Sequence, residues 1–533
     1  MGNSSESLVQ VLVGLGLAYT LVTVIRFSLQ SLPPKNYPPG PPSLPFVGNV
    51  RHIASNKLHI KFTEWRKTYG DIIGLKAGPT NLVILNGAEV ARELFEKRGA
   101  IYSGRPTDYI FRDHIIQDTT HILSLQNDSN LKLFRSAIKV LLGPAGCEQA
   151  LPLQDAGAAY FAYNLVTAPE TFQDHLHNWG MGTPLSAICG HRGAQKDKEL
   201  IKLFYDNQKD WLELLDPAFA PPVDMFPLLN YLPESCSAWR GKAAKVRKNL
   251  QFFYYMLLDC AQAELENDRA GNNEKPGGFL SLLARLLREQ DGKTKLDNHQ
   301  LAYFGGGVLD AAVDTTYLTA LTFIKILGGL PDVLKRAQEE VDSVSVGGQP
   351  PRVEDLEKLP YLKACFFEIL RWRPVVTINL PHTLDADDTF RGYFLPKGTV
   401  LLQNIWSDSH DPALYPSPDT FNPERYLANP YGTTLPAEKC KAEGRKVSYA
   451  FGSGRRSCPG NVFAQNGFIT MAAKLVWAFD VKPKGQLDLS AETGFHTGML
   501  MGSEPFEVEF IPRSEMHRQA IIDGCERTKV WLD

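Results

Sequence analysis

The stretch FGSGRRSCPG, residues 451–460, sets a single cysteine among glycines and arginines. The glycines carry no side chains and permit unusual backbone angles, so a flat ligand could approach the main chain there. Arg455 and Arg456 add positive field, which favours a thiolate over a thiol at Cys458. A cysteine thiolate is one of the axial ligands of haem iron, and it favours O–O bond cleavage. A cysteine alone is more often an inert core residue, but this segment is neither apolar nor regular.

A second candidate is the pair Glu368 and Arg371 in FFEILRWRP, which lies three residues apart on one face of a predicted helix. On a solvated surface such a pair contributes only about 0.2–0.5 kcal/mol. Arg425 in FNPERYL is a further guanidinium, and its planar fork suits bidentate binding of a carboxylate. The spacing alone leaves a solvated ion pair and a buried support both open.

A third candidate is GGGVLDAAVDTTYLTALTFI, residues 305–324, which places Asp314 and Thr315 in the middle of an apolar helix. A helix that is hydrophobic nearly all round is buried, and a buried carboxylate needs a physical reason. The alternative is a threonine bonded back to the preceding turn and an aspartate facing a solvated cleft.

Composition excludes several classes of protein. The chain has 533 residues, of which 44% are apolar and 22% charged, and its formal net charge of -3 gives no argument for nucleic-acid binding. Its eight cysteines show no CxxC spacing, which argues against a zinc module and a disulfide scaffold, so we expect reduced thiols facing the cytosol. Neither GxGxxG nor GxxxxGK[ST] occurs, so a fused nucleotide domain is not expected.

The N-terminus contains 18 uncharged residues from Leu8 to Ile25, about 27 Å as a helix. Positive charge follows at Arg26 and Lys35, which predicts that the body lies on the cytoplasmic side of a membrane. A cleaved signal peptide is the alternative, although the basic n-region and small-residue cleavage site that it needs are not evident. Asn3 in NSS fits a lumenal glycosylation acceptor.

We therefore predict three parts: a lumenal N-terminus and transmembrane anchor over 1–30, a stiff proline-rich connector over 31–49, and one domain over 50–533. Short apolar runs over residues 72–87 predict a small sheet, and most of residues 130–370 is predicted to be helical. The predicted fold class is mainly α with small β-sheets (α+β).

The cysteine segment matches FxxGxRxCxG, the haem-binding signature of the cytochrome P-450 monooxygenases, through Phe451, Gly454, Arg456, Cys458 and Gly460. The other two motifs follow in the family's order and spacing. The resemblance covers nearly the whole chain. The membrane anchor and the amino-acid sequence of residues 393–427 resemble those of microsomal fungal members. It implies the haem-thiolate fold of that family behind the anchor.

By this resemblance Cys458 is the axial ligand of a haem b iron, and Asp314 with Thr315 is the acid–alcohol pair that relays protons during oxygen activation. Glu368, Arg371 and Arg425 would form a buried network beneath the haem-binding loop. Further haem contacts are implied at Phe451, Gly452, Gly460 and, for the propionates, at Arg135, His382 and Arg456. The sequence departs from the family at Ala312, where glycine is usual, and at Leu131, where tryptophan is usual. Without the resemblance, His382 is predicted to be a surface histidine or a loop histidine whose ring is hydrogen-bonded within the protein.

The activity implied is insertion of one atom of O2 into a lipophilic small molecule at the endoplasmic reticulum, with the domain in the cytosol. Electrons would come from NADPH through the flavin of a separate reductase. A docking patch for this reductase is expected among the basic residues near the cysteine, which are Lys439, Lys441, Arg445, Lys446, Arg455 and Arg456. A merely solvated basic surface explains these residues equally well. The family's pocket segments correspond to 101–118, 211–226, 375–381 and 494–502, which are largely apolar. Two rivals remain, a haem-thiolate isomerase or dehydratase and a non-catalytic haem sensor, neither of which needs the acid–alcohol pair.

Overall fold

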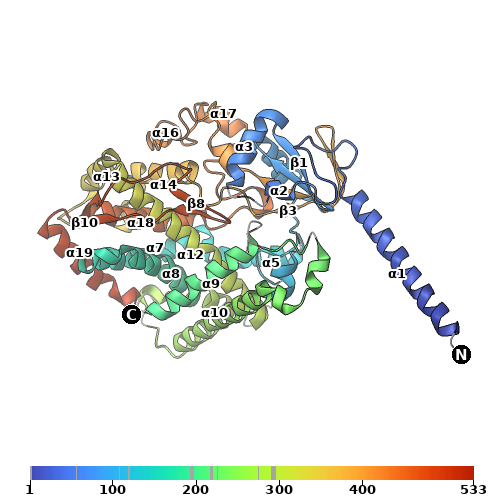
Figure 1. Cartoon of the computed structure of the whole chain (residues 1–533). Coiled ribbons are helices and arrows are strands. Elements are labelled where there is room, and N and C mark those ends of the chain that lie inside the picture. Colours follow the sequence, from blue (N-terminus) through green and yellow to red (C-terminus); the bar gives the residue numbers. More distant parts are fainter. Residues whose placement is uncertain are drawn as a thin grey trace.

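The computed structural model describes residues 3–532, apart from 54, 56, 107, 118–119, 192–196, 217–219, 225, 274 and 290–295. Helix α1 (Asn3–Gln30) extends away from the rest of the molecule (Figure 1). Within the described residues, Gln10–Gln30 is the only unbroken helix long and apolar enough to cross a membrane, and none of it is buried in protein. Such a helix needs another apolar medium, so α1 is compatible with a membrane anchor on the body. The Asn3 side chain lies outside the described part.

The segment between α1 and the body packs along β1 (Ile72–Ala77) and does not stand free as the stiff spacer that the prolines predict. The Gly74 N–H donates to the Pro39 carbonyl at 2.9 Å, and the Asn49 side chain accepts from the Lys76 N–H at 2.9 Å. Backbone polar groups at a strand edge need partners, and 31–49 supplies them.

The body is mostly helical, as predicted from the sequence. Its α-helices within the described residues are α2 (Val50–Ile53), α3 (Leu58–Tyr69), α4 (Ala88–Arg92), α5 (Ser129–Ala137), α6 (Lys139–Leu142), α7 (Pro144–Thr167), α8 (Phe172–Cys189), α9 (Lys198–Leu215), α10 (Ala238–Arg269), α11 (Leu282–Glu289), α12 (Asn298–Gly329), α13 (Pro331–Val344), α14 (Pro360–Trp372), α15 (Ile405–Ser409), α16 (Glu424–Ala428), α17 (Ala437–Ala442), α18 (Asn461–Ala478) and α19 (Glu515–Thr528).

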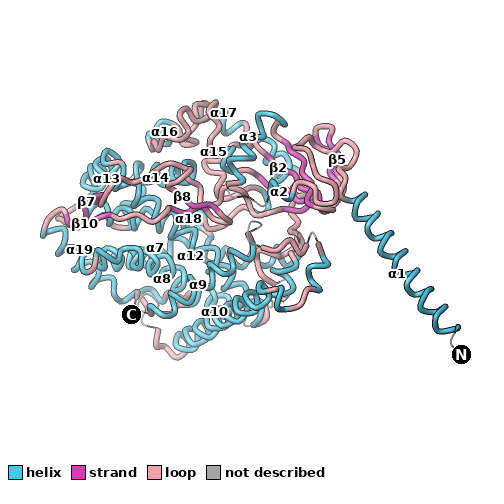
Figure 2. The backbone as a smooth tube through the Cα atoms, in the orientation of Figure 1, coloured by secondary structure: helices cyan, strands magenta, loops and turns pink. Residues whose placement is uncertain are grey.

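The sheets are small. The remaining strands are β2 (Thr80–Leu85), β3 (His382–Thr383), β4 (Asp388–Phe390), β5 (Tyr393–Leu395), β6 (Val400–Gln403), β7 (Phe479–Pro483), β8 (Phe495–Thr497), β9 (Met501–Ser503) and β10 (Val508–Pro512). The largest sheet has the order β1-β2-β6-β3, in which only β2 and β6 are parallel, and three two-stranded sheets pair β10 with β7, β4 with β5 and β8 with β9. Figure 2 shows the larger sheet near the inner end of α1 and helices filling most of the remaining body.

Helix α12 runs through the body and positions the third motif. A capping box starts it, since the Asp297 carboxylate accepts from the Gln300 N–H at 2.8 Å and the Gln300 side chain accepts from the Asp297 N–H at 3.0 Å. Pro331 then begins α13, and the two helix axes differ by 106°.

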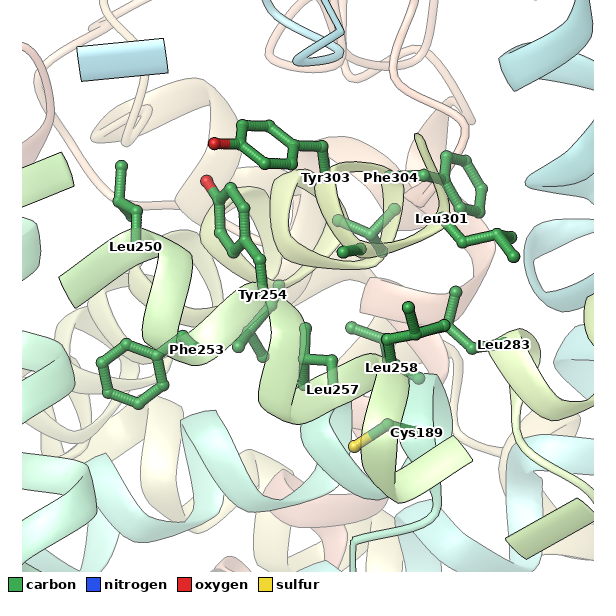
Figure 3. Close-up of a cluster of buried hydrophobic side chains, with 14 of the residues drawn as sticks. Cys189, Leu250, Phe253, Tyr254, Leu257, Leu258, Leu283, Leu301, Tyr303 and Phe304 are labelled. Atoms are coloured by element: carbon green, nitrogen blue, oxygen red, sulfur yellow. The ribbon is translucent and has the colours of Figure 1, made fainter. Parts of the chain in front are cut away.

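Two large hydrophobic cores meet on α12. The first includes α12 as far as Val313 and packs it against α10, as Figure 3 shows with Tyr254 of α10 beside Tyr303 of α12. The second takes up α12 again at Tyr317 and packs it against α14 and α18. The junction between the two cores therefore falls on the three polar residues 314–316.

Candidate active site

Two adjoining cavities lie at this junction. Their empty volumes are about 1130 and 770 Å³. Both are lined by Ala311, Thr315 and Thr316 from α12 and by Phe451, Cys458 and Ala464 from the cysteine segment and α18. The cysteine and the middle of α12 are thus two walls of one apolar slot.

The Cys458 side chain is solvent-accessible, yet burial raises the pKa of its thiol. The two facts agree because the sulfur faces a cavity inside the protein. A hydrogen bond from the Gly460 N–H at 3.4 Å and the charge of Arg135 oppose that rise and favour the thiolate. Sequence analysis attributed the positive field at Cys458 to Arg455 and Arg456, but in the structure it comes from Arg135. Arg455 is exposed and its guanidinium lies 3.4 Å from the Asn127 side-chain oxygen.

The loop backbone before the cysteine depends on glycine. Gly452 and Gly454 have φ values of 69° and 66°, in the left-handed region. A Cβ on Gly454 would lie 2.0 Å from the carbonyl oxygen of Phe95, so no other residue fits there. The Cys458 N–H donates to the Phe451 carbonyl at 2.7 Å and closes the turn.

On the opposite wall, Ala311 is exposed although it lies in the middle of a buried helix, because it faces the slot. The Thr315 hydroxyl donates to the Ala311 carbonyl at 2.8 Å, which is the back-bonded arrangement that the sequence left as an alternative. Thr315 nevertheless lines both cavities, so its oxygen keeps acceptor capacity toward a ligand in the slot. Ala312 lines only the smaller cavity.

Asp314 is half-buried behind Thr315 and lines neither cavity. Burial, and then the nearby charge of Asp310, raise the pKa of Asp314 to about 7. Neither a hydrogen bond nor a cation within the described residues offsets that rise. Burial and the Asp314 charge together raise the pKa values of Tyr205 on α9 and Tyr317 on α12, which places both phenols near this carboxyl.

Basic side chains concentrate along one edge of the larger cavity. Arg105, His382 and Arg456 line it. Burial and the neighbouring Arg456 lower the pKa of Arg105 to about 9, while burial and Arg135 lower the pKa of Arg456 to about 10. Burial and Arg105 lower the pKa of His382 to about 3, and its Nδ1–H donates to the Tyr102 carbonyl at 2.8 Å.

These cations are held by carbonyl oxygens and none of them has a carboxylate hydrogen-bond partner within the described residues. Arg456 donates to the Ser103 and Leu125 carbonyls, and Arg105 donates to those of Leu380 and Pro381. The Arg105 Nε is buried without a hydrogen-bond partner. Buried cations that lower one another's pKa favour an anion between them.

The residues fit haem on these grounds. The slot is apolar, the sulfur of a cysteine stands on one wall, and a cationic edge suits two propionates. Cys458 would be the axial ligand, and Arg105, His382 and Arg456 would hold the propionates. Arg135 lies near the sulfur and lines neither cavity, so its charge acts at Cys458 and Arg456. Haem in this site supplies reductive activation of O2.

The family model for cytochrome P-450 matches residues 38–510. The chain belongs to the cytochrome P-450 family. It is 33% identical over 524 residues to the cytochrome P-450 monooxygenase grgG of a Penicillium species, covering 94% of this chain and 92% of that protein. It is 31% identical over 487 residues to patH of Penicillium expansum, covering 91% of each. A cytochrome P-450 monooxygenase of Arthrobotrys oligospora is 30% identical over 505 residues, covering 93% of this chain and 92% of that protein.

A solved zebrafish cytochrome P-450 in complex with progesterone has the same fold, with a TM-score of 0.69 over 85% of this chain and 99% of that one, at 22% identity. The fold prediction is therefore confirmed, including the P-450 fold behind one apolar helix. The chain is a haem-containing oxidoreductase of the monooxygenase class, similar to fungal members.

The second motif of this P-450 chain forms a buried network. Arg371 donates to both Glu368 oxygens, at 2.7 and 2.8 Å, and both side chains are almost fully inaccessible. Arg425 Nε lies 3.6 Å from Glu368 Oε1, and the Asn422 N–H donates to the same oxygen at 2.8 Å. Arg371 also donates to the Ser409, Pro418 and Thr420 carbonyls. Each polar atom of the pair thus has a partner.

Several lining residues carried no signal in the sequence. Trp179 and Ile405 come from separate segments, and their types are common in any core or loop, whereas Arg105 belongs to the expected pocket segment 101–118. The expected segment 375–381 lines the larger cavity through Val375, Val376, Asn379 and Leu380. The segments 211–226 and 494–502 contribute no described residue to either cavity. Leu131, in the place of the family tryptophan, is buried in the first core.

Proposed function

We propose that this chain is a membrane-anchored P-450 monooxygenase that inserts one atom of O2 into a C–H or C=C bond of a lipophilic small molecule in secondary-metabolite biosynthesis. The observation that carries the proposal is the single slot in which Cys458 faces Thr315, with a cationic edge for haem propionates. An apolar lining excludes water and favours a lipophilic substrate. The fungal cytochrome P-450 monooxygenases among the relatives support the proposed monooxygenase activity.

The residues of α12 supply the proton chemistry in this proposal. Cleaving O2 to insert one atom and release the other as water consumes two protons. Thr315 positions a proton at the slot, and Asp314, which holds its own proton near neutral pH, delivers it from behind. Glu368, Arg371 and Arg425 hold the segments beneath the cysteine loop.

The direct test is Cys458→Ser with the full chain in lipid and a flavoprotein reductase. We expect the variant to lose the thiolate-type spectrum of the reduced, CO-bound haem, because the serine hydroxyl is a harder donor that stays protonated near neutral pH. The wild type should consume O2 steadily with NADPH and reductase. Turnover without reductase would favour the isomerase or dehydratase, and haem binding without turnover would favour the sensor. An unchanged spectrum would exclude Cys458 as ligand.

Electrons would arrive at the face that carries the cysteine loop. Of the predicted basic patch, Lys439, Lys441 and Arg455 are exposed. Arg445 pairs with Glu443 at 2.7 Å and Lys446 with Glu96 at 3.2 Å, while Arg456 turns to the slot. The proposed docking patch for an acidic NADPH-dependent reductase therefore narrows to the three exposed cations.

The predicted division into 1–30, 31–49 and 50–533 is retained, with the anchor in the endoplasmic reticulum and the domain in the cytosol. We expect deletion of residues 1–32 to weaken membrane association while haem incorporation stays intact, because no residue of the span Gln10–Gln30 is buried in the body. Carbonate extraction and the CO spectrum measure the two effects. Full extraction of the intact chain would contradict a spanning helix.

A further inference from the structure

A second group of reactive side chains lies outside the haem slot, where the end of α8 meets α10. Cys189 is the last residue of α8 and is fully buried, and Cys260 on α10 is partly accessible. The Cys189 thiol donates to the Leu185 carbonyl at 3.3 Å, and its sulfur lies close enough to the Cys260 sulfur for each to shift the pKa of the other. In Figure 3 the Cys189 sulfur lies beside the α10 segment that carries Leu257 and Leu258. Two cysteines thus touch, one of them within reach of solvent.

A histidine completes the group. His191 Nδ1 lies 3.7 Å from the Cys260 sulfur, and the Ser186 hydroxyl donates to the His191 carbonyl at 3.0 Å, which holds the residue in place. Gly190 between them adopts φ 69°, and a Cβ there would meet the Glu264 carboxyl at 2.5 Å. The backbone after α8 is therefore shaped to bring His191 to Cys260.

The group opens into a surface cavity of about 820 Å³ that is lined by polar residues, including His191, Cys260, Glu264, Asn272, Asn273 and Lys275. Glu264 is ion-paired with Lys275 and accepts from the Ser281 N–H at 3.1 Å, so the floor of this cavity is fixed. A small polar molecule can reach the Cys260 sulfur, whereas Cys189 is reached only through Cys260.

The electrostatics favour a thiolate at Cys260. Contacts with Cys189 and His191 lower the pKa of Cys260, and burial raises that of Cys189. The contact with Cys260 raises the pKa of His191. Among the described residues, the other charged groups near the pair are Asp259 on α10, Asp197 before α9, Glu264 and Lys275. An accessible thiolate beside a buried thiol is the arrangement of attacking and resolving cysteines.

We propose that Cys260, His191 and Cys189 form a thiol–disulfide exchange site that reacts with a low-molecular-weight disulfide such as glutathione disulfide. The Cys260 thiolate attacks one sulfur, the small S–S bond breaks, and the leaving thiolate takes a proton from His191. Cys189 then gives its proton to the now neutral His191 and attacks the Cys260 sulfur of the mixed disulfide, and the second small thiolate leaves and takes that proton from His191. Two protein thiols are oxidised to one disulfide, and one small disulfide is reduced to two thiols.

The test uses the full-length chain with haem bound, in lipid nanodiscs, incubated with glutathione disulfide. Free thiols are then alkylated and the cysteines are mapped by mass spectrometry. We expect a Cys189–Cys260 disulfide that excess glutathione reverses. Cys236 in the turn Glu234–Cys236 is the matched control, since it is more exposed and its sulfur contacts only the Ser235 hydroxyl among described side chains.

The pH profile separates the site from accessibility alone. An ordinary thiol loses rate about tenfold for each pH unit on the acid side, and the rate at Cys236 is measured beside that at Cys260 as the reference. Cys260 should keep its rate between about pH 8 and pH 6, and His191→Asn should restore the steep dependence at Cys260. A Cys260 rate that falls with pH as steeply as that of Cys236, or no Cys189–Cys260 disulfide in the wild type, would overturn the proposal.

Two variants test the two steps of the exchange reaction separately, the attack by Cys260 and the resolution by Cys189. Cys189→Ser should accumulate a glutathione mixed disulfide on Cys260, because no resolving thiol remains. Cys260→Ser should leave Cys189 unmodified, and modification of Cys189 in that variant would count against the order of attack. Retention of the haem spectrum shows that each variant is folded, and the wild-type mapping decides the proposal without them.

Discussion

Glu368 on α14 and Asp314 on α12 are both carboxylates withdrawn from water, and the protein treats them in opposite ways. Glu368 receives two hydrogen bonds from Arg371, one from the Asn422 N–H and the charge of Arg425. Asp314 has burial and a second carboxylate, Asp310, both of which raise its pKa.

The difference teaches how one residue class serves two purposes. A carboxylate whose oxygens are all engaged by guanidinium and N–H groups joins segments together, here α14 and the chain from Ser409 to Arg425. A carboxyl without compensation holds a proton near neutral pH and can release it, which suits a relay. Burial alone therefore does not mark a catalytic acid, whereas burial without compensation does.

The largest effect is expected from breaking the compensated site. Glu368→Gln removes the negative charge and leaves the guanidinium of Arg371 buried without an anion, which costs about 3–5 kcal/mol in comparable pairs. We expect little haem incorporation and a lowered unfolding temperature, measured from the CO spectrum and by circular dichroism. Glu515→Gln is the control, since Glu515 and Arg518 have the same three-residue spacing on an exposed surface and should change stability by less than about 1 kcal/mol. Equal stability of the two variants would refute the support role.

A smaller effect is expected at the uncompensated site, and it should appear in chemistry, with folding unchanged. Thr315→Ala should still bind haem and substrate. It should lose general acid catalysis of O–O cleavage, which contributes about 10²–10⁴-fold in rate, so that much of the NADPH consumed yields hydrogen peroxide. The measurement is product formed per NADPH consumed. Thr322→Ala is the control, because Thr322 lies on the same helix, is bonded back to the Leu318 carbonyl at 2.9 Å and lines neither cavity. With a substrate lacking hydroxyls, an unchanged ratio in Thr315→Ala would remove Thr315 from the relay.

The smallest effect is a change in pH dependence at Asp314. Its folded pKa of about 7 lies above the usual 3.8, so the group is protonated below about pH 7 and this contribution to the free energy of unfolding is lost as pH rises from about 4 to about 7. Product per NADPH should accordingly fall as pH rises through about 7. Asp314→Asn should have lower turnover without that fall, in parallel assays from about pH 6 to pH 8. Coupling that improves with pH in the wild type would contradict the assignment.

The sequence could predict the parts of the site that rest on short spacing. The pairing of Glu368 with Arg371 follows from one helical turn, and the place of Cys458 follows from glycines that its loop requires. Trp179 could not be predicted, and Arg105 was expected only as one residue of segment 101–118, because their approach to the slot depends on how distant segments pack. Whether Asp314 is compensated was equally hidden, since its partner could have come from anywhere in 533 residues. The connector over 31–49 was predicted as a free spacer because proline stiffness can be read from the sequence, whereas an open strand edge beside it cannot.

The cluster of Arg105, Arg135, His382 and Arg456 has a consequence for how the chain reaches its mature state. Burial lowers the pKa values of Arg105 and Arg456, and the charges of Arg456 and Arg135 lower them further, so without a dianion beside them the folded chain carries an electrostatic penalty. Any ligand that binds only the folded state shifts the folding equilibrium toward it, and here that ligand also removes the repulsion. Folding and haem loading are thus thermodynamically linked. In a cell short of haem, the empty chain is the species exposed to chaperones and proteases, and the abundance of the enzyme follows the haem supply.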